Sequence, residues 1–191
     1  HGQYHGQSVV LAFSRWGKVA SAITATTLLA RFEVDMIIFT GVAGAVSKTL
    51  HVGDVVIAEK LYQHDMNAEP IFPRFQIPLT TSTYFQTRPD NIKKAKSAAL
   101  HFVKHFHDLI PKSDRDTFAL SNPKVVVGTI ASGDQFVADP ATRDTLHPEG
   151  ENVLAVEMEG AAVAQVCEEH EKPYLIIRTI SDDAGSSAHI D

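Results

Sequence analysis

The sequence lacks several features that would each define a class of protein. It holds a single cysteine, Cys167, so it can form no internal disulfide, and a reducing cytoplasm is the expected location. No apolar run reaches the roughly 18 residues that a membrane span requires. The first ten residues, HGQYHGQSVV, carry no signal-peptide pattern. We therefore expect a cytoplasmic protein with no membrane partner.

Positive charge is also scarce. The formal net charge is −6, and the lysines and arginines form no block that could neutralise a phosphate backbone, which argues against a sequence-independent nucleic-acid binder. The ten histidines are scattered, and the densest group, His101, His105 and His107, lies in a Lys-rich stretch with no carboxylate or cysteine at ligand spacing. The sequence thus predicts no metal and no cofactor, and its expected partner is a small molecule.

Strand-like and helix-like segments alternate along the chain. At 191 residues and 44% hydrophobic content, the chain can bury one substantial core. Because most strand-like runs are fully apolar, we expect an α/β fold of three αβα layers, with a central mixed, mostly parallel sheet flanked by helices. The long segment 66–90 shows no clear periodicity and is predicted to be a loop. The predicted strands lie within 8–14, 35–46, 124–137, 153–158 and 172–185, a strand pair is predicted within 52–65, and the predicted helices lie within 17–32, 91–110 and 159–172.

Polar residues follow the ends of several predicted strands. Because ligands bind beyond the carboxyl ends of strands in such sheets, these residues are candidates for one site. Each has a simpler explanation when taken alone. Asp134 can be a turn carboxylate, and Ser181 with Asp182 can cap a helix. Glu157 and Glu159 can share one face at a sheet edge.

Arg178 favours a site over these separate explanations. It lies inside YLIIRTI, a run that should be buried, and a buried arginine needs a carboxylate or an anion-like partner. Gly41 and Gly44, at the end of another apolar run, are explained by a tight turn if they are considered in isolation. Together with the neighbouring carboxylates, they predict a ligand site instead.

Five motifs carry a resemblance to a known family. In order along the chain they are TGVAGA, VGDVVIA, SGDQFV, AVEMEGAAVAQVC and IIRTISDDA. In this order and spacing they resemble the 5′-methylthioadenosine/S-adenosylhomocysteine nucleosidases of the nucleoside phosphorylase superfamily, over nearly the whole chain. AVEMEGAA and RTISD are the most specific. The resemblance implies hydrolysis of the N-glycosidic bond, which releases adenine and a 5′-thio-substituted ribose without a metal or cofactor.

The resemblance implies a role for each polar group at the reacting bond. Asp182 is implied to be the general acid that protonates adenine at N7, and Ser181 to orient it. Glu159 is implied to accept hydrogen bonds from the ribose hydroxyls and to favour the positive charge that develops on the sugar. Met158 is implied to pack against the sugar. Arg178 is implied to help position the attacking water.

The base-binding residues follow from the same resemblance. Phe136 is implied to stack on the purine, while the backbone of Val137 reads its edge. Gly44 is implied to let the backbone approach the ligand closely. Glu157 is assigned to the substrate site, with a structural hydrogen bond as the open alternative.

The sequence also departs from the family pattern. Family members begin with a strand and a glutamate-rich turn, one glutamate of which activates the water, and they continue past residues 189–191 with a helix. We therefore expect residues 1–191 to form a single nucleosidase domain that is incomplete at both ends. Val42 stands where some relatives have a serine that helps hold the water. Phe72, Phe75 and Ile77 are candidates for the contact of an implied homodimer or for the 5′ alkylthio pocket.

Two other functions stay open at this point. A phosphorolytic relative would need cationic groups for phosphate, and MIIFTGVAG, residues 36–44, has no basic residue before its glycine turn, which favours hydrolysis. A non-catalytic nucleoside-binding protein is the other alternative, since fold does not fix function. The combination of Asp182, Glu159 and Arg178 argues against it. A futalosine-type substrate or AMP also fits the hydrolase class.

Overall fold

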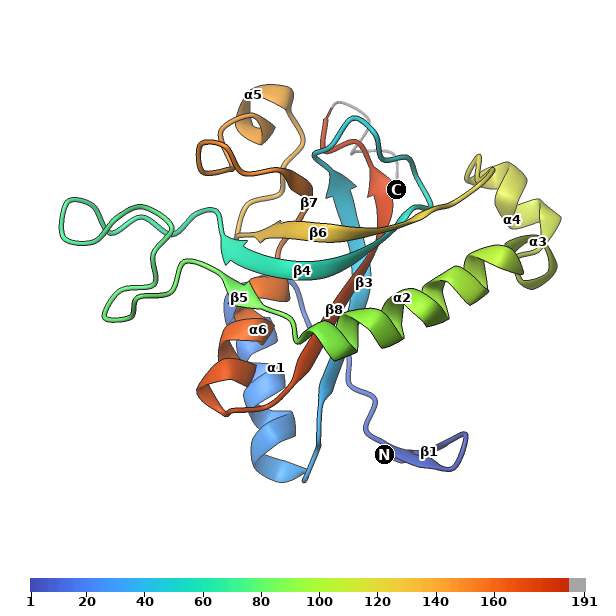
Figure 1. The fold of residues 1–191 in the computed structure, drawn as a ribbon, viewed down its shortest axis with the longest axis horizontal. Helices are drawn as coiled ribbons and strands as arrows, with labels where there is room; N and C mark the ends of the chain where they lie inside the picture. The colour runs from blue at the N-terminus through green and yellow to red at the C-terminus, as the bar shows by residue number, and fades with distance from the viewer. Residues whose placement is uncertain (186–191) are drawn as a thin grey trace.

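A six-stranded mixed sheet forms the centre of the structure, a computed structural model that describes residues 1–185 (Figure 1). Residues 189–191, past which family members were said to continue with a helix, lie outside the described residues. The strand order is β5-β4-β6-β7-β3-β8. The strands of this sheet are β3 (Ile37–Ala45), β4 (Val55–Gln63), β5 (Phe85–Gln86), β6 (Val125–Ser132), β7 (Val153–Glu157) and β8 (Tyr174–Asp182).

The sheet closes on itself. The pairs β3–β8, β4–β6 and β6–β7 are parallel, whereas β3–β7, β4–β5 and β4–β8 are antiparallel. Strand β4 makes closure possible because its first residues pair with β8 and its later residues pair with β5 along the same edge. A register shift between Ala58 and Lys60 adds local twist. The predicted mixed sheet is confirmed, and its closure into a ring is a feature that the sequence did not predict.

Helices cover both faces of this sheet, which confirms the three predicted layers (Figure 1). Because side chains alternate along a strand, Val56 and Ala58 face α6 (Gly160–Glu169) while Ile57 faces α2 (Pro89–Lys104). Helix α1 (Lys18–Arg31) packs against α6. The shorter helices are α3 (Phe106–Leu109), α4 (Lys112–Thr117) and α5 (Pro140–Arg143). No helix within residues 1–185 is both long enough and apolar enough to span a bilayer.

The first predicted strand, 8–14, is wrong as a member of the central sheet. Only β2 (Gln7–Val9) forms there, and it pairs with β1 (Gly2–Tyr4) in a separate hairpin. Leu11 and Phe13 are 92% and 89% exposed. The apolar pattern predicted burial, but a strand also needs a hydrogen-bonded neighbour, and the described part of the chain supplies none for residues 10–15.

Three smaller expectations also change. Strand β3 forms as predicted, but Ile38 and Val42 are exposed, so it is not fully buried. The helix predicted over 91–110 is interrupted at His105, where α2 ends and α3 begins. Residues 55–63 form the single strand β4 and not the predicted strand pair. Phe75 and Ile77 pack in the core clusters of this chain.

Candidate active site

The carboxyl ends of three strands meet at Gly44. In the antiparallel pair β3–β7, Gly44 lies opposite Val156, and in the parallel pair β3–β8 it lies opposite Asp182. A register shift between Ala43 and Gly44 brings Asp182 into this position. Because β3 pairs with both β7 and β8, the ends of these three strands lie together, and the polar residues predicted as a site lie at or just after them.

Three residues form an inner cluster beneath this meeting point: Ser132, Glu157 and Arg178, all buried. The Ser132 hydroxyl and Arg178 Nη2 donate hydrogen bonds to the two carboxylate oxygens of Glu157. The first amides of α6 complete the set, because Gly160 N–H donates to both oxygens at 2.9 Å and Glu159 N–H donates to Oε2 at 3.1 Å. Glu157 is thus fully satisfied by protein donors, which favours its structural alternative over substrate contact.

Arg178 is directed toward carboxylates. Its guanidinium pairs with Glu157, lies 3.5 Å from Glu159 Oε2, and stacks over the Phe39 ring with 4.4 Å between Cζ and the ring centroid. A side chain at Gly41 would collide with Nη1, so glycine is required there for the arginine to fit. Arg178 Nε has no hydrogen-bond partner among the described residues. The buried arginine predicted from YLIIRTI therefore has the carboxylate partner that it needs.

The outer cluster consists of Glu159, Ser181 and Asp182, which are partly exposed. Glu159 Oε1 accepts a hydrogen bond from Gly17 N–H at 2.9 Å. Burial raises the pKa of Glu159 above its ordinary value, and the nearby Glu157 adds to this, while the Gly17 amide and Arg178 oppose it. Unlike Glu157, Glu159 keeps lone pairs that no described protein donor uses.

Asp182 is oriented by two hydrogen bonds. Ala184 N–H donates to Oδ1 at 2.8 Å, and the Ser181 hydroxyl lies 2.8 Å from Oδ2. The Ser181 hydroxyl is also 3.4 Å from the carbonyl oxygen of Ala43 on β3. A Cβ at Gly44 would lie 2.9 Å from Asp182 Oδ1, so glycine here makes room for the carboxylate itself. The structure thus adds a reason for Gly44 besides the predicted approach to a ligand.

The turn after β6 presents the predicted base-binding residues. Phe136 is 55% exposed, whereas Val137 is buried against Tyr62 and its neighbours. Met158 lies in the sequence between Glu157, the last residue of β7, and Glu159, and it is partly exposed. An exposed ring beside a backbone held by a buried residue fits a surface on which a planar base can stack.

Sequence reasoning missed four residues that hold these groups in place: Gly17, Lys18, Asp65 and Ser132. Lys18 N–H donates to Asp134 Oδ1 at 2.7 Å, and Asp134 N–H donates to Asp65 Oδ2 at 2.9 Å. The only signal for them was their position: Gly17 and Lys18 begin a predicted helix, Asp65 ends a predicted strand segment, and Ser132 lies within one.

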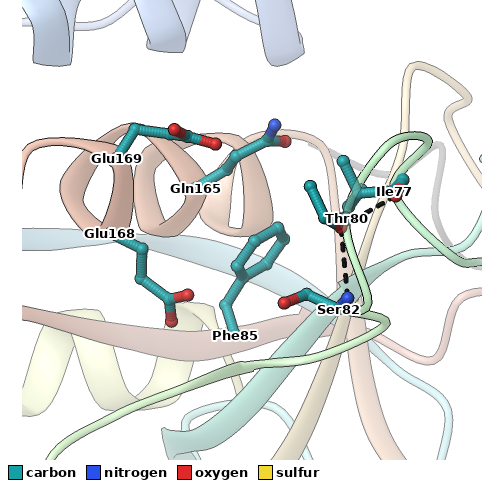
Figure 2. A pocket seen from close by; sticks show the side chains of 7 residues that line it. All are labelled: Ile77, Thr80, Ser82, Phe85, Gln165, Glu168 and Glu169. Atoms are coloured by element: carbon teal, nitrogen blue, oxygen red, sulfur yellow. Dashed lines mark hydrogen bonds between the residues drawn. The ribbon is translucent and has the colours of Figure 1, made fainter.

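A separate pocket of about 220 Å³ lies between α6 and the segment before β5 (Figure 2). Glu168 on its wall is engaged, because its Oε1 accepts hydrogen bonds from the Tyr174 hydroxyl and Gln86 N–H. None of the strand-end residues lines it, so this pocket is not the candidate active site. Within residues 1–185, no group of three His, Cys, Asp or Glu side chains is arranged to hold a metal ion.

Comparisons with known proteins identify the family of this chain. The model of the Phosphorylase superfamily matches residues 1–191. A 5′-methylthioadenosine/S-adenosylhomocysteine nucleosidase from Mycobacterium bovis is 39% identical over 199 residues, which cover 100% of this chain and 75% of the relative.

Two solved structures extend the comparison. The nucleosidase of the same name from Neisseria meningitidis, in complex with methylthio-immucillin-A, has a TM-score of 0.82 and 34% identity, over 99% of this chain and 74% of that one. The futalosine hydrolase of Helicobacter pylori has a TM-score of 0.80 and 33% identity, over 99% and 72% of the two chains. The chain belongs to the phosphorylase superfamily and, within it, to the family of 5′-methylthioadenosine/S-adenosylhomocysteine nucleosidases.

Proposed function

We propose that the protein hydrolyses the N-glycosidic bond of 5′-methylthioadenosine and S-adenosylhomocysteine and releases adenine. The observation that carries this proposal is the pairing of an oriented aspartate with a partly unsatisfied glutamate where three strand ends meet. The nucleosidases to which the chain is similar, one of them bound to methylthio-immucillin-A, support the substrate class.

Asp182 acts as the general acid in this proposal. Ala184 N–H donates to Oδ1 and the Ser181 hydroxyl donates to Oδ2, so the plane of the carboxyl group is fixed toward the proposed position of the base. Transfer of the proton to N7 lets adenine leave as a neutral base, since the electron pair of the glycosidic bond then no longer creates an anion.

Glu159 acts on the sugar. Its remaining lone pairs accept hydrogen bonds from the ribose hydroxyls, and its negative charge stabilises the oxocarbenium-like sugar as the bond to the base breaks. Met158 packs against the same ring. Phe136 stacks on adenine, and the backbone of Val137 donates to and accepts from the edge of the base.

Arg178 and Glu157 support Glu159 in this scheme. The arginine lies 3.5 Å from Glu159 Oε2 but is committed to Glu157, and the two buried side chains neutralise one another. We assign to Arg178 first the role of positioning Glu159. Through Glu159, Arg178 also helps to position the attacking water. Glu157 organises the first turn of α6, from which Glu159 projects.

The test is product analysis with 5′-methylthioadenosine, in phosphate-free buffer and again with phosphate. We expect free adenine and free methylthioribose in both buffers. A sugar 1-phosphate formed only with phosphate would establish a phosphorylase instead. The similarity to futalosine hydrolase makes futalosine the competing substrate, and a higher kcat/KM for it would reassign the substrate within the hydrolase class.

We also propose a cytoplasmic homodimer that acts in methionine salvage. The single cysteine fits a reducing compartment. Val19 and Ile23 are exposed four residues apart on α1, and the exposed Trp16 lies just before this helix, which fits an apolar contact between two copies. Sedimentation equilibrium of the full-length protein tests this state, and a monomer at micromolar concentration would refute it.

A further inference from the structure

The start of α1 joins two strand ends that hold different parts of the site. Gly17 N–H donates to Glu159 Oε1 at 2.9 Å, and the next amide, Lys18 N–H, donates to Asp134 Oδ1 at 2.7 Å. The first amides of a helix have no partner within the helix, so they are available for such contacts. Glu159 follows β7 and Asp134 follows β6. One dipeptide therefore holds the carboxylate proposed for the ribose and the turn proposed for the base.

The side chain of Lys18 closes this arrangement into a ring of contacts. Lys18 Nζ lies 2.7 Å from Asp65 Oδ1 and 3.0 Å from Gln63 Oε1, both at the end of β4. Asp65 Oδ2 in turn accepts the Asp134 amide at 2.9 Å. Lys18 thus contacts Asp134 directly through its backbone and indirectly through Asp65. We call Gly17, Lys18, Asp65 and Asp134 the strand-end bridge.

The Lys18–Asp65 pair differs from an ordinary surface ion pair. Its side chains are 18% and 28% exposed, whereas those of Lys112 and Asp116 on α4 are 79% and 63% exposed. Burial alone would raise the pKa of Asp65, but the hydrogen bonds from Lys18 and from the Asp134 amide outweigh it and lower the pKa. Exposed pairs contribute little, so the burial and the shared amide make the bridge a specific contact.

Gly17 shows how closely the parts fit. Its φ is +91°, and a Cβ there would lie 2.9 Å from Asp134 Oδ1. Glycine is therefore required both by the backbone conformation and by the approach of the carboxylate. Because Asp134 precedes Phe136 by two residues, a shift of the bridge moves the base-binding turn.

We propose that Lys18 and Asp65 are positioning residues that set the distance between the base-binding turn and Glu159, and so adjust affinity for the adenine nucleoside. This inference rests on the proposed function, because it assigns residues 134–137 to the base and Glu159 to the ribose. Neither Lys18 nor Asp65 takes part in proton transfer. Loss of the bridge should therefore weaken binding more than it slows the chemical step.

The test uses Lys18→Met, Asp65→Asn and the double variant in the full-length protein. The readouts are the dissociation constant of adenine by calorimetry and kcat and KM for 5′-methylthioadenosine. We expect both the adenine constant and KM to rise about tenfold, with kcat within about threefold of the parent, as for loss of one charge-assisted contact. The double variant should bind adenine no more weakly than the weaker-binding single variant, because both substitutions break the same contact between Lys18 and Asp65. Lys18→Arg should restore most of the affinity.

The controls separate the possible failures. Lys112→Met and Asp116→Asn remove an exposed pair of the same types and should change neither constant. Thermal melting reports folding, and if Lys18→Met does not fold, Asp65→Asn carries the test, because asparagine preserves the shape and one acceptor. Unchanged adenine affinity in folded Asp65→Asn would overturn the positioning role, as would a loss confined to kcat. A parent protein that binds no adenine would instead overturn the proposed function.

Discussion

The inner cluster and the outer cluster lie at the same strand ends, yet their hydrogen bonding differs. In the inner cluster, Glu157 receives donors from Ser132, Arg178 and two backbone amides, and it is buried. In the outer cluster, Glu159 and Asp182 are partly exposed and keep acceptor sites that no described protein donor fills. Two glutamates only two residues apart thus have different environments.

This difference indicates that the inner cluster is suited to supporting the fold and the outer cluster to contacting a substrate. A fully satisfied buried carboxylate cannot bind a ligand without giving up a protein donor, so the inner cluster is suited to holding the strand ends together. A partly satisfied carboxylate at the rim can exchange water for substrate hydroxyls at little cost. Substitutions in the two clusters should accordingly affect different observables, and the following predictions run from the largest expected effect to the smallest.

Asp182→Asn should have the largest effect, on turnover. Without the acid the base leaves as an anion, and we expect kcat to fall about 10² to 10⁴-fold, the usual contribution of general acid catalysis. The affinity for adenine and the melting temperature should change little, because asparagine preserves the contact with Ala184 N–H. Single-turnover kinetics and calorimetry measure the two quantities. Near-normal turnover would remove Asp182 from its proposed role.

Glu157→Gln and Arg178→Met should mainly reduce stability. Each leaves a buried charge without its partner, which costs about 3–5 kcal/mol in the free energy of unfolding. Urea unfolding measures this cost. The double variant should recover part of the loss, because it removes both charges together. If each single variant unfolds at the same urea concentration as the parent, the inner cluster is not the support that its hydrogen bonds indicate.

Glu159→Gln should weaken substrate binding with little loss of stability. The pKa of Glu159 is raised above its ordinary value of 4.5, so the folded state keeps its proton to a higher pH than the unfolded chain does. The contribution of Glu159 to stability is therefore greatest below pH 4.5 and is lost as pH rises through the folded pKa. Relative to Glu159→Gln, the parent should lose stability between acid and neutral pH. Urea midpoints of both proteins at several pH values test the sign, and an opposite slope would contradict it.

Ser181→Ala should have the smallest effect. It removes one hydrogen bond to Asp182 Oδ2, which contributes about 0.5–1.5 kcal/mol in general, so kcat should fall about two- to tenfold. Threonine at this position keeps the hydroxyl and serves as the matched control. A loss as large as that of Asp182→Asn would mean that Ser181 itself transfers the proton.

Much of this architecture followed from sequence patterns. The apolar runs of β4, β6, β7 and β8 were long enough, and flanked clearly enough by turns, to locate each strand. The buried Arg178 followed from its place in such a run, and the structure supplies its carboxylate partner. These inferences depend on the succession of neighbouring residues along the chain, which can be read directly from the sequence.

The remaining features depend on contacts between distant segments. Ring closure through β4 and β8, the separate hairpin of β1 and β2, and the exposed side of β3 cannot be predicted from local periodicity. Lys18 and Asp65 were missed for the same reason, because a lysine at a helix start and an aspartate after a strand occur in most proteins. Only their meeting at Asp134 distinguishes them.

The closure of the sheet by β8 has a consequence for how the chain folds. Strand β8 pairs with residues 37–44 and 55–57, which come from the first third of the chain. Such long-range pairings form slowly, because a large loop must close before they contribute. During synthesis, β3 and β4 cannot form these pairings until β8 has been made, and Asp182 is the last residue of β8. Asp182 therefore reaches its place beside Gly44 only after β8 has been made and has paired with β3, so a nascent chain that ends before β8 cannot form this meeting of strand ends.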